Sequence, residues 1–176
     1  AAVEIYHEAG IPAGVLQVVH GDGLVGSLLT GEDVDHICFT GSAEVGQLIR
    51  QEAAKSWHKT TSCEMGSKSA CIVFDDADID MAVDAAIASA FKLSGQRCVS
   101  SGRMIVQRDV YDEFCKKFVA KASELETGNP FNDDGNVNAD MYYGPIVNKQ
   151  GFDKVVKYND MVASDSLAEV VATPVR

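Results

Sequence analysis

The stretch Phe39-Thr40-Gly41-Ser42-Ala43-Glu44-Val45-Gly46 has the pattern of a strand that turns sharply and continues as a helix. Residues 35–39 supply the apolar strand, and Ser42 is a favoured helix N-cap residue. Apolar side chains then recur at helical spacing, at Val45, Leu48, Ile49 and Ala53. The unpaired N–H groups and the dipole of a helix N-terminus favour an anion. Residues 41–46 are therefore either a phosphate-binding turn or an ordinary capped helix start.

Strands and helices are expected to alternate along the rest of the chain. Short apolar runs predict strands at residues 15–20, 35–39, 60–63, 70–74 and 103–107. Helical spacing and capping residues predict helices at residues 1–8, 27–29, 42–55, about 79–91, from Asp109 onward, and 148–161. Gly10 is expected to end the first helix, and residues 128–144 form a polar loop. This alternation predicts an α/β fold with a largely parallel sheet.

Composition narrows the functional classes. The chain has 176 residues, of which 46% are hydrophobic and 23% charged, with a formal net charge of -11. A nucleic-acid surface needs clustered Lys and Arg, so the charge argues against a nucleic-acid partner. No apolar run approaches the roughly 20 residues of a membrane helix, and the N-terminus has no signal-peptide pattern, so no membrane partner is expected.

The five cysteines are Cys38, Cys63, Cys71, Cys98 and Cys115. Their spacing fits neither CxxC nor a zinc pattern, so no metal site is expected. Several lie in apolar runs, which indicates buried free thiols in a reducing compartment and favours a cytoplasmic protein.

A second glycine-rich turn, Gly21-x-Gly23-x-x-Gly26, matches the dinucleotide-binding fingerprint by letter and follows the strand expected at residues 15–20. No clear acidic residue ends a strand about 20 positions later, as that fingerprint requires. Phosphate contact at Gly21 and an ordinary glycine turn both stay open.

Cys98 differs from the other cysteines because its neighbours are polar and glycine-rich, in the stretch Ser94-Gly95-Gln96-Arg97-Cys98-Val99-Ser100. A nucleophilic thiol needs exposure and a nearby cation or backbone N–H groups that favour the thiolate. Arg97 is adjacent in sequence, although its side chain can point elsewhere. The alternative is that Cys98 is a small structural residue.

Glu64 stands between an expected strand and Gly66. A carboxylate at such a junction can face a cleft and, when partly buried, serve as a general base for water. The alternative is a salt bridge, for example with Lys68. The four histidines, His7, His20, His36 and His58, do not form a recognisable hydrolase motif with a serine or cysteine, so a Cys–His protease is poorly supported.

Taken together, these pieces resemble the aldehyde dehydrogenase superfamily. The matching stretches are Phe39 to Gly46, Glu64-Met65-Gly66-Ser67-Lys68, Phe74-Asp75-Asp76-Ala77-Asp78, Gly95-Gln96-Arg97-Cys98, Gly128-Asn129-Pro130 and Tyr143-Gly144-Pro145. Their order, and the spacing of 98 − 64 = 34 positions between Glu64 and Cys98, agree with that family. Ser67 departs from the family pattern, which has glycine there, and a positive φ at this site would strain a serine.

The resemblance implies a role for each of these residues. Gly41, Ser42, Ala43, Glu44, Val45 and Gly46 would open the helix that holds the pyrophosphate of NAD or NADP, and the Met65 carbonyl would face the nicotinamide amide. Cys98 would attack a small-molecule aldehyde and form a thiohemiacetal, which loses hydride to become a thioester. The Cys98 N–H and a second donor would hold the oxyanion. Glu64 would activate the water that releases the carboxylate.

The resemblance also implies a domain layout. Residues 1–63 would be part of a Rossmann-like NAD(P)-binding domain, 64–68 the junction, 69–163 part of the catalytic α/β domain, and 164–176 an irregular tail. We expect the chain to be the middle third of a longer enzyme, which is a homo-oligomer, and to have no dehydrogenase activity in isolation. Two other readings remain: a relative in which coenzyme A takes the acyl group, against which Glu64 argues, and a truncated, non-catalytic binding or structural fold.

Overall fold

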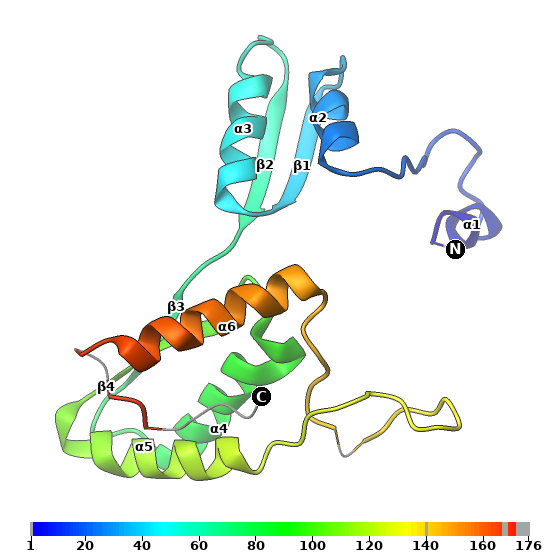
Figure 1. The fold of residues 1–176 in the computed structure, drawn as a ribbon. Helices are drawn as coiled ribbons and strands as arrows, with labels where there is room; N and C mark the ends of the chain where they lie inside the picture. Colours follow the sequence, from blue (N-terminus) through cyan, green and yellow to red (C-terminus); the bar gives the residue numbers. More distant parts are fainter. Residues whose placement is uncertain (1, 140, 167–168, 172–176) are drawn as a thin grey trace. The chain divides into compact units, whose positions relative to one another are not determined.

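A computed structural model describes residues 2–139, 141–166 and 169–171 of the chain (Figure 1). The chain divides into two compact units, Ala1–Met65 and Gly66–Arg176. Each unit contains one pair of parallel strands with a helix between them, so the expected α/β class is confirmed. The division falls after Met65. The assignment of a cofactor-binding and a catalytic domain to these parts stays a prediction.

The first unit is built around a two-stranded parallel sheet. Its elements are α1 (Ala2–Glu8), α2 (Gly23–Gly31), β1 (His36–Gly41), α3 (Ala43–Ala53) and β2 (Thr60–Met65). The strands pair in register from His36 beside Thr60 to Gly41 beside Met65. Helix α3 connects them, and the buried residues of this helix are Gly46, Ile49 and Ala53. The expected helix face is therefore only half correct, because Val45 and Leu48 are exposed.

Gly10 ends α1 as expected. Its φ of 99° lies in the left-handed region that glycine adopts without a steric penalty. The N–H of Ile11 donates to the carbonyl of Tyr6 at 3.0 Å, and that of Gly10 to His7 at 2.9 Å. This pair of bonds satisfies two carbonyls that the helix end leaves open.

The strand expected at residues 15–20 is wrong. These residues form a turn followed by irregular backbone. Val15, Val18 and Val19 are 72%, 54% and 62% exposed. A strand needs a neighbour for its N–H and C=O groups, and no described strand pairs with this segment. A β-branched composition alone therefore did not produce a strand here.

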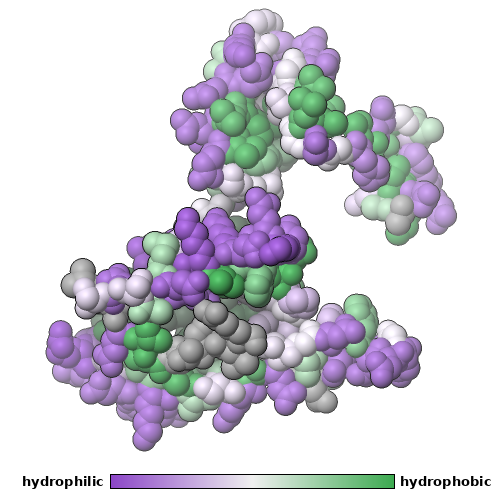
Figure 2. Space-filling view, viewed as in Figure 1, coloured by the Kyte–Doolittle hydropathy of each residue, from purple (hydrophilic) through white to green (hydrophobic). Residues whose placement is uncertain are grey.

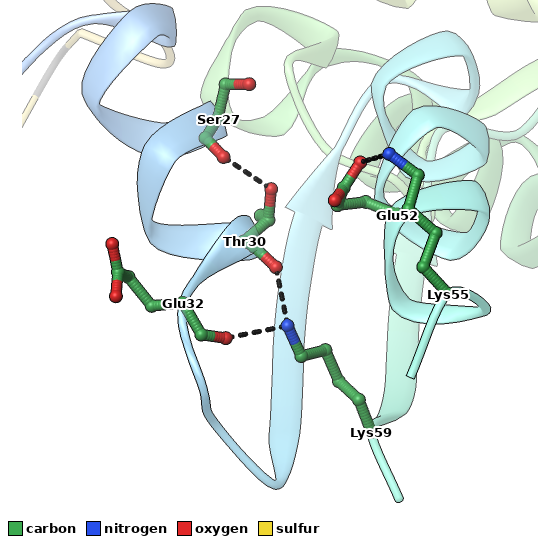
Figure 3. A network of polar contacts seen from close by, with 6 residues as sticks. All are labelled: Ser27, Thr30, Glu32, Glu52, Lys55 and Lys59. Atoms are coloured by element: carbon green, nitrogen blue, oxygen red, sulfur yellow. Dashed lines mark hydrogen bonds and ion pairs between the residues drawn. The ribbon is translucent and has the colours of Figure 1, made fainter. Parts of the chain in front are cut away.

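Lys59 ties the end of α2 to the approach to β2 (Figure 3). Its ammonium donates to the carbonyl oxygens of Thr30 at 2.9 Å and Glu32 at 2.7 Å. Both carbonyls lie at the C-terminal end of α2, where the helix dipole is negative and the last C=O groups lack helical partners. One half-buried cation thus satisfies two acceptors more than 25 residues away in sequence.

A close approach inside the first unit explains two glycines. A Cβ at Gly41 would lie 2.4 Å from Phe39 Cζ, and a Cβ at Gly46 would lie 2.6 Å from Met65 Sδ. Neither glycine has a positive φ. Gly41 therefore leaves room for the Phe39 ring, and no positive φ calls for glycine there, which corrects the expectation of a sharp turn.

The second unit repeats the strand–helix–strand plan. Its elements are β3 (Ser69–Val73), α4 (Ile79–Phe91), η1 (Lys92–Gly95), β4 (Ser101–Val106), α5 (Arg108–Ser123) and α6 (Lys149–Ser164). Strands β3 and β4 are parallel, and Ser69 pairs with Ser101 at their amino ends. The core of this unit comprises Val73, Val83, Ala86, Ile87 and Phe114. The expected apolar face of α4 is confirmed, since Ile79 and Phe91 also pack against this core.

The start of α4 agrees with the sequence expectation, whereas the start of α5 and the end of α6 differ from it. Asp78 caps α4 by accepting the Met81 N–H at 3.0 Å. Asp109, expected to cap α5, lies instead in its first turn. The cap position is Gln107, whose N–H still donates to the Val73 carbonyl at 2.9 Å, so the helix begins directly after the strand. Helix α6, capped by Asn148, runs three residues further than expected, to Ser164.

The loop expected at residues 128–144 is confirmed for its described residues, with only isolated bridges at Thr127–Tyr143 and Phe131–Val137. Of the expected tail, residues 165–166 and 169–171 are irregular, and residues 167–168 and 172–176 lie outside the described residues.

Ion pairs join α4 and α5. Lys117 lies 2.7 Å from Asp80 and 2.8 Å from Glu113, and Lys121 pairs with Asp84. The hydrogen bond to Asp80, followed by that to Glu113, raises the pKa of Lys117. The bond to Asp84 likewise raises the pKa of Lys121. Both lysines therefore bind the neighbouring helix, and Lys121 also lies in the last turn of its own helix, where a cation is favourable.

Apolar side chains are also found on the surface of the first unit. Figure 2 shows them over α2 and α3. Leu24, Leu28 and Leu48 are each more than 60% exposed. An apolar surface of this kind is typical of an interaction site.

We expect Lys59→Met to lower the free energy of unfolding of the first unit by about 1–3 kcal/mol, because it removes two hydrogen bonds from a charged donor. Hydrogen exchange of the β1 and β2 amides measures this loss. The matched control is Lys55→Met, whose ammonium pairs with Glu52 on the surface. That change should stay within about 0.5 kcal/mol. Equal effects of the two substitutions would contradict the assigned role of Lys59.

The Gly46–Met65 approach predicts a dependence between the two positions. Alanine in a helix interior is favoured over glycine by up to about 1 kcal/mol. We expect Gly46→Ala to show that gain only in a Met65→Ala background, because Met65 Sδ otherwise occupies the space of the new Cβ. The same exchange measurement, made on the two single variants and the double variant, gives the coupling. An equal gain in both backgrounds would show that the sulfur moves away at no cost.

Candidate active site

Parallel pairing brings several of the proposed site residues to one edge of the first sheet. Thr40 lies beside Glu64 and Gly41 beside Met65, at the carboxyl ends of β1 and β2. Because α3 follows β1 directly, the first turn of α3 begins at the same edge. Ligands of open α/β sheets bind outside the carboxyl ends of the strands. The structure thus brings residues 41–46 together with Glu64 and Met65.

The start of α3 has the features of an anion site. Ser42 Oγ accepts the Val45 N–H at 3.3 Å, and the Gly46 N–H donates to the Ser42 carbonyl at 3.0 Å. The residues of this turn, 42–45, are exposed. An exposed first turn of an 11-residue helix presents N–H groups and a positive dipole end, which fit a pyrophosphate. Glu44 adds one negative charge at this end, which favours the helix and opposes a bound anion.

Gly21 is placed differently. It precedes α2, and its Cβ would lie 2.4 Å from Val25 Cβ in the first turn of that helix. Asp22 caps α2 by accepting the Leu24 N–H at 2.9 Å. The strand that should precede this fingerprint is absent, as described above. The structure therefore favours the ordinary glycine turn at this position, and cofactor contact by Gly21 stays a prediction.

The Glu64 side chain is exposed, in contrast to the partial burial expected of it. Among the described residues it forms no ion pair, so the alternative of a salt bridge with Lys68 finds no support. The Lys68 carbonyl instead accepts from Arg103 Nη2 at 2.6 Å and Nε at 3.1 Å. Glu64 thus presents an exposed carboxylate near the carboxyl end of β2.

Ser67 is not strained. Among the described residues other than glycine, only Leu93 and Ser94 have a positive φ. The Ser67 hydroxyl shares a hydrogen bond with Ser69 Oγ at 3.1 Å. The departure from glycine at this position therefore costs nothing in backbone conformation.

Cys98 lies in the connection from α4 to β4, and its side chain is exposed. The Ser100 N–H donates to the Arg97 carbonyl at 3.2 Å, which places Cys98 at the second position of a tight turn. In the described part of the chain, the N–H groups of Cys98 and Val99 have no acceptor. Backbone N–H groups without an acceptor are available to a thiolate or an oxyanion.

Arg97 points toward α4. Its Nη2 donates to the carbonyls of Ala88 and Ser89, each at 3.2 Å. These carbonyls belong to the last turns of α4, where a cation is favourable. The Arg97 side chain therefore anchors the loop to α4 and does not supply a cation to the Cys98 thiol.

The amino ends of β3 and β4 place two site segments together within the second unit. Ser69 pairs with Ser101, so residues 66–68 and 98–100 enter the sheet side by side. A Cβ at Gly102 would lie 3.6 Å from Lys68 Cα, so these two segments of the chain approach each other closely. Residues 66–68 directly follow Glu64 and Met65 in the chain.

Sequence reasoning missed two residues of the Cys98 loop. Ser94 Oγ donates to the Gly144 carbonyl at 2.5 Å, and Gln96 Oε1 accepts the Val147 N–H at 3.0 Å. Their partners lie 50 and 51 positions away, so no local pattern could reveal them. The only signal available was polar side chains flanking a glycine next to a candidate nucleophile.

No group of three or more His, Cys, Asp or Glu side chains within residues 2–139, 141–166 and 169–171 is placed to hold a metal ion. None of the helices in the described part is long and apolar enough to cross a membrane.

Comparisons with known proteins show which sequences and folds this chain resembles. The family model described as the aldehyde dehydrogenase family matches residues 1–172. An aldehyde dehydrogenase from Brucella melitensis is 39% identical with a TM-score of 0.83, over 93% of this chain and 33% of that one. An NADP-dependent enzyme from Escherichia coli is 37% identical with a TM-score of 0.86, over 97% and 34%. A Staphylococcus aureus betaine aldehyde dehydrogenase, solved with NAD⁺, is 30% identical with a TM-score of 0.83, over 93% and 32%.

The chain thus spans about a third of the length of these three solved relatives. The family model covers residues 1–172, and the solved relatives are similar in both sequence and fold. The chain belongs to the aldehyde dehydrogenase family.

Proposed function

We propose that this chain supplies the nucleophile, the base and the pyrophosphate-binding turn of an NAD(P)-dependent enzyme that oxidises an aldehyde to a carboxylate. One observation carries the proposal. The sheet edge that holds Glu64 and the α3 N-terminus continues, within four residues, into the strand that enters its sheet beside the Cys98 loop. The proposed layout is a cofactor-binding domain before residue 64 and a catalytic domain after residue 68.

Residues 41–46 would hold the pyrophosphate of the cofactor at the exposed start of α3. The Met65 carbonyl, at the end of β2 beside Gly41, would accept from the nicotinamide amide. When bound, NAD or NADP supplies the hydride acceptor. One solved relative was crystallised with NAD⁺ and another is described as NADP-dependent, so both cofactors are compatible with the family.

Cys98 would attack the aldehyde carbon and form a thiohemiacetal. The exposure of its side chain and the free N–H groups of Cys98 and Val99 support this role. An N–H donor aimed at the developing oxyanion lowers the barrier because it needs no reorganisation during the reaction. Loss of hydride from the thiohemiacetal leaves a thioester on Cys98.

Glu64 would take a proton from the water that hydrolyses this thioester and releases the carboxylate. Its freedom from ion pairs among the described residues supports a base rather than a structural role. A coenzyme A thiol would not need this base, which disfavours the acylating alternative.

The same proposal covers the substrate, the partners, the cellular location and the oligomeric state. We propose a small-molecule aldehyde as the substrate and, given the net charge of -11, no nucleic-acid partner. Free cysteines support a cytoplasmic location. The exposed apolar side chains of α2 and α3 support a homo-oligomer.

The base is tested by Glu64→Gln in the longer enzyme that the resemblance predicts. We expect one equivalent of reduced cofactor per site in a rapid burst, followed by a steady-state rate lowered by about 100-fold or more, because deacylation has lost its general base. Stopped-flow absorbance of the reduced cofactor separates the two phases. Glu52→Gln, at the opposite end of α3, is the matched control and should keep the original rate. An unchanged steady-state rate in Glu64→Gln would favour the acylating or the non-catalytic alternative.

The isolated 176-residue chain is expected to show no turnover with NAD or NADP and an aldehyde, because it spans only about a third of the solved relatives. Absorbance of the reduced cofactor measures this directly. A nucleotide titration of the same chain tests the pyrophosphate turn separately. Sustained turnover by the isolated chain would refute the expectation.

A further inference from the structure

The loop that carries Cys98 begins with an unusual backbone. Leu93, Ser94 and Gly95 are consecutive and all have positive φ, at 53°, 58° and 68°. The left-handed region is open to glycine but unfavourable for leucine and serine, and such residues persist only where the surroundings hold them. Leu93 is 67% exposed, so burial of its side chain does not hold this turn.

Side-chain hydrogen bonds hold the turn from the distant segment 144–147. Ser94 Oγ donates to the Gly144 carbonyl at 2.5 Å. Gln96 Oε1 accepts the Val147 N–H at 3.0 Å, while Gln96 Nε2 donates to the Leu93 carbonyl at 3.2 Å. The Gln96 amide thus joins the left-handed turn to segment 144–147 with both of its polar atoms, two residues before Cys98.

We propose that Gln96 is a positioning residue for Cys98: its amide clamps the left-handed turn to segment 144–147 and so fixes the turn that presents the Cys98 thiol beside free backbone N–H groups. The proposal rests on the proposed function in treating Cys98 as the nucleophile. Release of the clamp allows Leu93 and Ser94 to return to right-handed conformations, which alters the direction of the chain immediately before Cys98. The thiol is already exposed, so release gives it little extra access and removes the fixed N–H groups that favour the thiolate.

The test uses the 176-residue chain and needs neither cofactor nor aldehyde. Gln96→Met keeps the length of the side chain and removes both polar atoms. Val147→Pro removes the N–H that Gln96 accepts, and Val147→Ala is the matched control that keeps it. The rate of iodoacetamide alkylation at Cys98 is followed at constant pH by peptide mass spectrometry. Cys38, exposed in the other unit, serves as the internal reference.

We expect Gln96→Met and Val147→Pro each to slow alkylation of Cys98 by about three- to ten-fold, because Val147→Pro removes the bond to segment 144–147 and Gln96→Met removes both that bond and the one to the Leu93 carbonyl. The double variant should be no slower than Gln96→Met alone, because that substitution already removes the bond that Val147→Pro removes. Val147→Ala and the rate at Cys38 should be unchanged. In Gln96→Met, the Val147 amide should also exchange its hydrogen faster by a similar factor.

An unchanged Cys98 rate in Gln96→Met, or additive effects in the double variant, would overturn the proposal. Faster alkylation of the half-buried Cys71 and Cys115 reveals a variant whose second unit has unfolded. Gln96→Met removes the acceptor of the Gln96–Val147 bond and Val147→Pro removes its donor. If one of these variants unfolds, the alkylation rate of the other therefore tests the proposal. An unchanged alkylation rate would contradict the role of Gln96 but not the proposed aldehyde oxidation. Lack of turnover in the longer enzyme would contradict the proposed oxidation but not the role of Gln96.

Discussion

Parallel pairing of strands is the constraint on which the arrangement of the site depends. Two parallel strands cannot be joined by a tight hairpin, so a crossover must return the chain to the starting edge. In the first unit α3 makes this return, and its amino end therefore lies beside Glu64 and Met65. In the second unit α4 makes the same return. The loop that contains Cys98 then connects the end of α4 to the amino end of β4.

The local parts of this plan could be predicted from the sequence. Helix α4 follows from apolar residues at helical spacing with Asp78 as its cap, and both are short-range features. The α/β class followed from the alternation of such segments. The strand expected at residues 15–20 failed because a strand depends on a partner, which the residues themselves do not specify.

The residues of the candidate site could be predicted from the sequence, but the hydrogen bonds that hold its loop could not. Cys98 and Glu64 stood out by their neighbours, whereas the direction of the Arg97 side chain did not follow from its position in sequence. The bonds of Ser94 and Gln96 span about fifty positions, so only the folded chain brings the partners together. The reason for Gly41 likewise became clear only from the ring of Phe39, which occupies the space of a side chain.

The left-handed turn also places two opposing demands on a single residue. At Leu93 the backbone alone matters, so glycine or asparagine would relieve the conformational cost without removing a bond. At Ser94 the same exchange for glycine would relax the backbone and lose the hydroxyl that reaches Gly144. Selection for thermal stability alone would thus accept glycine or asparagine at Leu93. At Ser94, thermal stability and the fixed position of the thiol favour different amino acids.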